Sequence, residues 1–166
     1  MSHASVARTA NLLGAFALAA SERLDVRSDT AAIVSLLTTL DGQSQEALRR
    51  ALGLTQTAVV RLVDRLAGEG LVERRPGPDG RTRSIVVTAA GREAALAAQD
   101  RRADAMQALL EPLDAEDRRR LAGLLEKLLG GLTHGRDDAF HICRLCDLRV
   151  CPQDRCPITL GVEDAP

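Results

Sequence analysis

The chain has 166 residues, which fits one compact domain with a short appendage and excludes two large domains. Apolar residues make up 45% and charged residues 27%, a balance that excludes a disordered chain, and no apolar run reaches the roughly 18 to 20 residues of a membrane span. The net charge of −1 means that a polyanionic partner can be bound only by a local patch of positive charge. With only two aromatic residues, the chain lacks the stacking platforms that bind single-stranded nucleic acid.

The first segment admits two interpretations. Arg8 and the apolar stretch 12–20 imitate a secretory signal. Apolar residues that recur at three- and four-residue steps instead predict a buried helix over about 6–24. These residues are Leu13, Phe16, Ala17, Ala20 and Leu24. The four cysteines lie within fourteen residues, which suits metal binding in a reducing compartment better than a disulfide framework. We therefore predict the helix and a cytoplasmic location.

Three further helices are predicted before residue 70. One spans 28–40 and ends at the turn pair Asp41-Gly42, a short one follows Ser44, and the next begins after Thr55 as N-cap. In the last of these, Val59, Leu62, Val63 and Leu66 stand at i, i+3, i+4 and i+7 and predict the packed face. The residues left facing outward are Gln56, Thr57, Val60, Arg61 and Asp64.

A hairpin and two long helices follow. Gly70 can supply a left-handed stop, and the turn-rich stretch 76–80 separates two extended segments, 71–75 and 84–88. An alanine-rich helix is predicted from Gly91 to Leu110, and another begins after Asp114 as N-cap and runs to about Leu129.

This order of elements predicts a winged helix-turn-helix, a mainly α fold with a small β-hairpin wing. An exposed helix face that carries short polar side chains and an arginine can read base edges in the major groove, and Val60 can meet a thymine methyl group. Arg81 and Arg83 at the hairpin tip suit the minor groove. Segment 41–91 holds eight arginines against six acidic residues, so positive charge gathers there. The alternative is that the same pattern is a plain packing unit.

Segment 44–91 resembles the MarR family of bacterial transcriptional regulators. The specific features are Asp79-Gly80-Arg81 in the wing and Val87-Thr88-x-x-Gly91 at the start of the next helix, although the family usually has leucine at the position of Val87. The resemblance implies a homodimer built by the first helix and the last two, bound to double-stranded operator DNA with two-fold related half-sites. It also implies that Arg81 enters the minor groove, held by Asp79. The candidate DNA-contacting residues are Thr55, Gln56, Thr57, Val60, Arg61, Asp79, Arg81 and Arg83.

The cysteines form the pattern Cys143-x2-Cys146-x4-Cys151-x4-Cys156. This is the spacing of a zinc knuckle, with cysteine in place of its histidine, and four thiolates satisfy tetrahedral zinc. His141 is a spare ligand candidate. An iron–sulfur cluster is the main alternative because a cysteine followed by proline also occurs in ferredoxin-type ligation, and unmetallated thiols are the third.

We therefore predict three regions: a DNA-binding domain with a helical dimerisation region over 1–131, a linker over 132–140 and a cysteine-rich tail over 141–166. The predicted function is a transcriptional regulator, most simply a repressor that is released by an unknown small-molecule effector or by a redox or metal signal. The chain is not expected to be an enzyme, because it has no nucleotide-binding glycine pattern and no recognisable catalytic pair. No membrane partner is expected, because no apolar run is long enough to span a bilayer. The alternatives are an iron–sulfur redox protein and a protein-interaction module.

Overall fold

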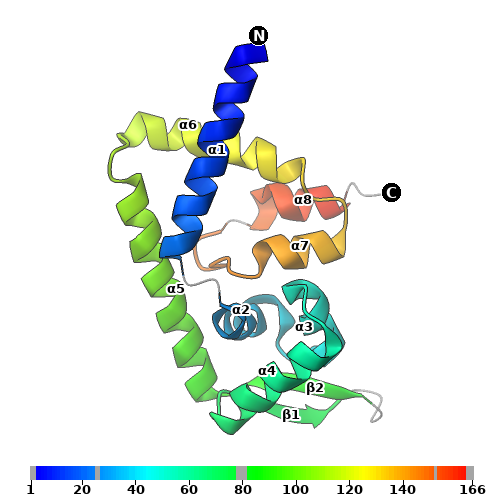
Figure 1. Cartoon of the computed structure of the whole chain (residues 1–166). Helices are drawn as coiled ribbons and strands as arrows, with labels where there is room; N and C mark the ends of the chain where they lie inside the picture. The colour runs from blue at the N-terminus through cyan, green and yellow to red at the C-terminus, as the bar shows by residue number, and fades with distance from the viewer. Residues whose placement is uncertain (1–2, 25–26, 78–81, 152, 164–166) are drawn as a thin grey trace.

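The helices and hairpin are arranged along one long helix, α5. The computed structural model describes residues 3–24, 27–77, 82–151 and 153–163. The elements in chain order are α1 (His3–Arg23), α2 (Ser28–Ser35), the π-helical turn η1 (Leu36–Leu40), α3 (Gln45–Leu52), α4 (Gln56–Gly68), β1 (Val72–Pro76), β2 (Arg83–Val87), α5 (Ala89–Leu110), α6 (Ala115–Gly130), α7 (Arg136–Cys143), the 3-10 turn η2 (Gln153–Arg155) and α8 (Pro157–Glu163). In Figure 1, α1 and α6 lie at one end of the molecule and the hairpin at the other.

Side-chain caps set where these helices begin. The side-chain oxygens of Ser44, Thr55, Thr88 and Asp114 accept backbone N–H groups in the first turns of α3, α4, α5 and α6. The predicted caps at Thr55 and Asp114 are therefore confirmed. Gly70 has φ +70°, the left-handed conformation expected after α4. Helix α5 begins two residues before Gly91.

The hydrophobic core lies between α2, α3, α4, the hairpin and the first half of α5. The four α4 residues predicted to pack, Val59, Leu62, Val63 and Leu66, are all at most 2% exposed. They meet core residues of the neighbouring elements, which are Leu36, Leu40, Leu48 and Ile85. The two strands pair antiparallel from Val72 opposite Val87 to Pro76 opposite Arg83. The predicted mainly α winged helix-turn-helix fold is confirmed.

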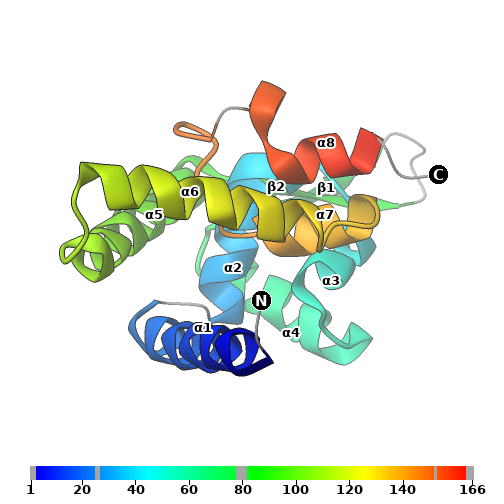
Figure 2. The ribbon, with the colours of Figure 1, turned by 90° about the horizontal axis from the view of Figure 1, so that it is seen from above.

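Helix α1 is present as predicted, but the prediction that it is buried is wrong for the single chain. Leu12 is 60% exposed and Phe16 48%, and Ala20 is the buried residue among those described in this helix. The periodicity identified an apolar face correctly, but no other described segment covers most of that face. Figure 2 shows α1 standing apart on one side of the molecule.

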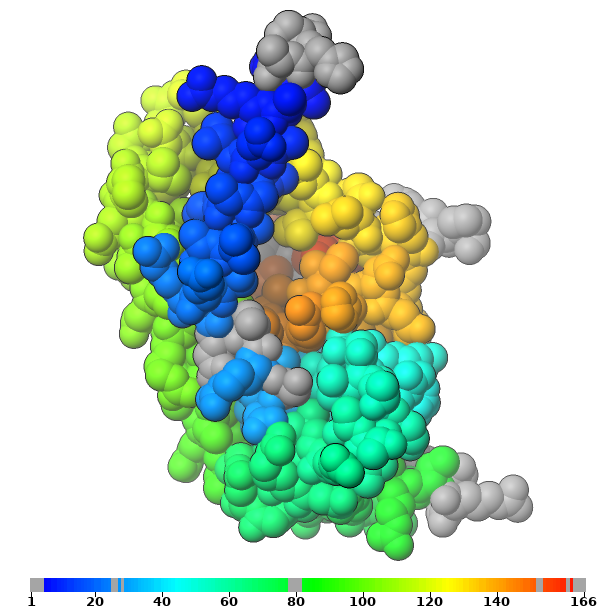
Figure 3. All heavy atoms as spheres, in the orientation of Figure 1, coloured from blue at the N-terminus to red at the C-terminus, as the bar shows by residue number. Residues whose placement is uncertain are grey.

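The tail packs against the rest of the chain. Residues 136–140, expected to belong to a linker, form the beginning of α7, which packs on α3, while α8 packs on α6. In Figure 3 the orange tail lies between the yellow end of α6 and the cyan helices of the DNA-binding region. Among the described helices, none combines the length and apolar character needed to cross a membrane.

Candidate DNA interface and cysteine tail

The outward face of α4 carries the predicted recognition residues. Gln56, Thr57 and Arg61 are exposed, and Val60 is half-buried. The side-chain oxygen of Thr55 accepts the N–H of Ala58 at 3.3 Å, so this oxygen serves as the helix cap. Because the opposite face of α4 is fully packed, the outward residues are held in a fixed orientation.

Ion pairs neutralise many of the arginines counted in this region. Arg49 pairs with Glu46 at 2.7 Å, and Arg74 pairs with Asp64 at 2.6 Å, which ties β1 to α4. Further pairs join Arg65 to Asp29, Arg75 to Glu73 and Arg50 to Asp137. Sequence reasoning missed these pairs, which join different elements in three of the five cases.

Two arginines of this region stand apart from that pattern. Within the described residues, Arg61 on α4 and Arg83 on β2 form no ion pair, and both are exposed. Both were predicted to contact DNA. Their charges are therefore available to an external anion such as a phosphate group.

The wing is a short hairpin. The N–H of Gly77 donates to the carbonyl oxygen of Thr82 at 2.9 Å, which closes the base of its loop. The predicted contacts Asp79 and Arg81 lie in segment 78–81, outside the described residues.

The Thr-x-x-Gly motif joins the wing to α5. The hydroxyl of Thr88 donates to the carbonyl oxygen of Gly70 at 2.7 Å, and its oxygen accepts the N–H of Gly91 at 3.0 Å. A Cβ on Gly91 would lie 1.9 Å from the carbonyl oxygen of Leu71, so only glycine fits there. The motif thus fixes the end of α4, the hairpin and α5 relative to one another.

Comparison with known proteins agrees with this geometry. Residues 25–82, from the start of α2 into the wing, match a family model described as MarR family. Over this segment the chain is similar to the MarR family. None of the curated proteins compared with the chain matches it.

Solved structures resemble most of the chain. A probable transcriptional regulator from Pseudomonas aeruginosa is 26% identical, with a TM-score of 0.51 over 76% of this chain and 96% of that one. A MarR family protein from Bacillus stearothermophilus is 22% identical, with a TM-score of 0.67 over 77% and 95%. The reduced form of MarR from E. coli is 24% identical, with a TM-score of 0.60 over 72% and 95%. The last two likenesses concern the fold alone.

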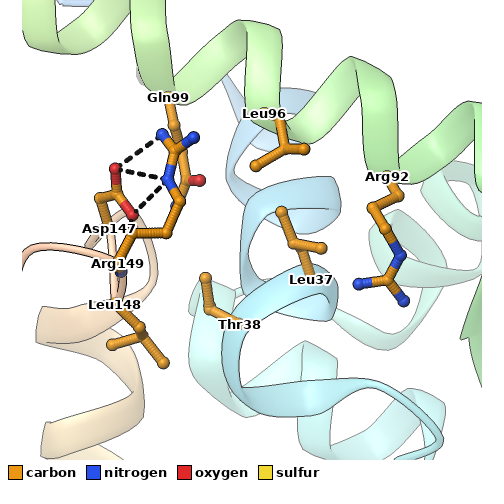
Figure 4. A pocket seen from close by; sticks show the side chains of 8 residues that line it. All are labelled: Leu37, Thr38, Arg92, Leu96, Gln99, Asp147, Leu148 and Arg149. Atoms are coloured by element: carbon orange, nitrogen blue, oxygen red, sulfur yellow. Dashed lines mark hydrogen bonds and ion pairs between the residues drawn. The ribbon is translucent and has the colours of Figure 1, made fainter.

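A cavity of about 360 Å³ lies between α5, η1 and the tail. Leu37, Leu96 and Leu148 form its apolar walls, as Figure 4 shows. At one side, the guanidinium group of Arg149 pairs with Asp147 at 2.7 Å and with Asp100 at 2.9 Å. The volume lies at the small end of the range of about 300 to 1,000 Å³ that is usual for small-molecule sites.

A second apolar surface is formed by exposed side chains of α1 and α6. In α6 no residue is buried, and Leu124, Leu125 and Leu128 are 42% to 57% exposed. A groove of about 560 Å³ runs between Leu125 and Leu128 of α6 and Leu13 of α1. Together these leucines form an exposed apolar patch, a feature typical of protein–protein interfaces.

The four cysteines are close together and form two pairs. A hydrogen bond with the Cys143 thiol lowers the pKa of Cys146 to about 7, and the positive charge of Arg102 on α5 acts in the same direction. The same bond, burial and the charges of the other three thiolates raise the pKa of Cys143. All four sulfur atoms therefore lie within electrostatic reach of one another.

The second pair joins Cys151 to Cys156. Burial raises the pKa of Cys151 to about 11. Burial also acts to raise the pKa of Cys156, but hydrogen bonds from the backbone N–H groups of Thr159 and Ile158 outweigh it, so the pKa of Cys156 is lowered. None of the four cysteines, all of which lie in the described residues, forms a disulfide bond. Over the described ranges, no three His, Cys, Asp or Glu side chains are arranged as the ligands of one metal ion. The spare candidate His141 donates from Nδ1 to the carbonyl oxygen of Ala51 at 2.9 Å.

Proposed function

We propose that this chain is a DNA-binding transcriptional regulator of the MarR type, a homodimeric repressor that binds a pseudo-palindromic operator and leaves it when a signal arrives. The observation that carries the proposal is the pair of unpaired, exposed arginines, Arg61 and Arg83, on the two elements that a winged helix-turn-helix presents to DNA. Arg61, with Gln56 and Thr57, reads the major groove, while Arg81 and Arg83 reach a neighbouring minor groove. Thr55, Val60 and Asp79 complete the proposed contact surface.

The uncovered face of α1 and α6 supports a dimer. Its leucines lie at the end of the molecule opposite the hairpin, so two copies can associate there while both wings remain free (Figure 1). Burial of this face against a second copy removes apolar area from water at roughly 25 cal/mol per Å². Two-fold symmetry then places the two α4 helices in successive major grooves, at half-sites about 10 base pairs apart.

The cavity between α5 and the tail supports release by a small molecule. A compound that enters it contacts α5, which leads to the dimerisation helices, and η1, which belongs to the DNA-binding core. Its leucine walls favour an apolar compound. A compound that binds the DNA-free arrangement of these elements better than the DNA-bound one lowers operator affinity by that difference.

Binding to the protein's own promoter tests the proposal. A labelled promoter fragment is titrated with the full chain at several salt concentrations. We expect two chains per operator, retention far above that of a scrambled fragment of equal length, and an affinity that falls steeply with salt because released counterions drive binding. Equal, weak retention of both fragments would overturn the proposal and favour the interaction-module alternative.

Repression is tested separately. A reporter gene under the same promoter should be expressed more strongly when the regulator is absent. A fall in reporter expression on removal of the regulator would reverse the proposed sign and make the protein an activator.

A further inference from the structure

The cysteines of the chain all lie between the end of α7 and the start of α8. Cys143 is the last residue of α7, and the N–H of Cys146 donates to its carbonyl oxygen at 2.8 Å, a tight turn that places the two thiols in contact. Cys151 and Cys156 form the second thiol pair, and Cys156 directly precedes α8. Two cysteine pairs, each at a turn, are the arrangement from which four-thiolate metal sites are built.

Buried side chains of the core hold the backbone of the first pair. The hydroxyl of Ser35 in α2 donates to the carbonyl oxygen of Arg144 at 2.9 Å, and the amide of Gln99 in α5 donates to that of Cys146 at 3.0 Å. Ser35 is 0% and Gln99 4% exposed. The tail is thus built into the core, and the first thiol pair has a fixed position.

The helices on either side of the cysteines contact two different parts of the molecule. On one side, His141 of α7 bonds to the carbonyl oxygen of Ala51 at the end of α3, and Asp137 pairs with Arg50 at 3.6 Å. On the other side, Pro157 of α8 packs so closely on α6 that a Cβ on Gly130 would touch it at 3.8 Å. The cysteine segment therefore links α6 of the proposed dimer surface to the helix-turn-helix.

We propose that the four cysteines bind one zinc ion, and that the metal-bound tail braces the DNA-binding helices against α6. The inference rests on the proposed DNA-binding function and adds that zinc binding regulates operator affinity. Zinc suits four soft thiolates, and the positive charge of Arg102 on α5 offsets part of the charge of about −2 that a four-thiolate zinc site carries. Zinc binding requires the two pairs to close onto one ion.

The brace acts on DNA affinity through preorganisation. With zinc bound, α7 is held on α3 and α8 on α6, which limits the positions that the two α4 helices of a dimer can adopt. Less conformational freedom is then lost when both helices enter their grooves. Without zinc, the two thiol pairs are no longer tied to each other, and only the hydrogen bonds and packing of each half hold the tail on the core. We therefore expect operator affinity to fall by about 5- to 150-fold, the usual range of coupling between two sites.

The first experiment tests the metal site on the full chain purified without oxygen. Elemental analysis should give one zinc per chain, and Cys146→Ser and Cys151→Ser should each lose it. Replacement of zinc by Co²⁺ should give the visible bands of tetrahedral thiolate-bound cobalt. Asp154→Asn, an exposed change in the same loop, is the matched control and should retain the metal. Iron with a brown colour, or no stoichiometric metal, would overturn the zinc assignment.

The second experiment tests the coupling. Operator affinity is measured by fluorescence anisotropy before and after chelation, with circular dichroism to check that the helices remain. The double variant Asp137→Ala, His141→Ala breaks the contact of α7 with α3 but keeps all four cysteines. We expect it to retain zinc, to bind the operator as weakly as the chelated wild type, and to lose little more affinity on chelation.

The outcomes separate the two proposals. If chelation leaves operator affinity unchanged, the brace is wrong even though the zinc site stands. If the zinc-loaded protein ignores the operator, the proposed function fails, while metal content and the cobalt spectrum still decide the site.

Discussion

Gly91 and Leu71 approach so closely that a Cβ on the glycine would lie 1.9 Å from the leucine carbonyl oxygen. This contact connects the first turn of α5 to the residue that precedes β1. The same carbonyl oxygen accepts the N–H of Thr88 at 3.0 Å, so a shift of Leu71 also disturbs the cap of α5.

The first prediction concerns this contact. Gly91→Ala should lower the free energy of unfolding by about 1 to 3 kcal/mol, because the added methyl group meets backbone and cannot be relieved by a side-chain rotation. Gly123→Ala in α6 is the control, since a Cβ there has nothing within 4 Å and should stabilise the helix by up to about 1 kcal/mol. Thermal denaturation of both variants measures the difference. Equal melting temperatures would contradict the steric argument.

The second prediction separates affinity from base preference. Gln56→Ala should alter the preferred base at one position of each half-site, whereas Arg81→Ala should weaken binding to all sequences and flatten the salt dependence. Each loss should be about 5- to 150-fold, the value of roughly 1 to 3 kcal/mol for a specific contact. Arg119→Ala on the exposed face of α6 removes the same charge far from the wing and serves as control. Binding to a randomised operator library distinguishes the two effects, and unchanged binding by the Arg81 variant would remove the wing assignment.

The third prediction concerns the dimer. Leu128→Asp places a charge on the exposed apolar face of α6, where a second copy is expected to pack. We expect a folded monomer in analytical ultracentrifugation and operator affinity reduced by about 10² or more, since the second recognition helix no longer binds as part of the same molecule. Arg119→Asp changes charge on the opposite face of the same helix, nine residues or about 180° away from Leu128, and should leave the dimer intact. A dimer that survives the Leu128 change would point to a different contact surface.

The fourth prediction concerns tail docking. Ser35→Ala leaves the carbonyl oxygen of Arg144 without its buried donor and should cost about 1 kcal/mol of stability. It should also make segment 144–151 more sensitive to limited proteolysis. Thr38→Val is the control because its hydroxyl donates to Val34 within the same helical segment, at 2.9 Å. Similar cleavage rates for both variants would show that the Ser35 bond does not hold the tail.

The helix-turn-helix could be predicted from sequence because its signals are local. The spacing of Val59, Leu62, Val63 and Leu66 determines which face of α4 packs, and the caps Thr55 and Asp114 act within three residues of themselves. Turn residues and β-branched residues located the hairpin for the same reason. The zinc site and the DNA contacts remain predictions.

Other features depend on contacts between distant residues and could not be predicted in this way. Helix α7 is eight residues long and polar, so its sequence resembles a linker, and its contacts with α3 hold it in place. The pair Arg74 and Asp64 joins a strand to a helix, which no periodicity reveals. The apolar face of α1 was visible in the sequence, but periodicity does not tell which partner covers a face.

Helix α5 spans 22 residues, which gives it a length of about 33 Å. Because it runs from the end near α6 to the wing, it is a lever arm that pivots at its α6 end in the proposed dimer (Figure 1). A rotation of about 5° at that pivot displaces the far end by about 3 Å, close to the rise of one base pair. A small rotation at the α6 end of each α5 is thus enough to move the two α4 helices of the proposed dimer out of register with successive major grooves.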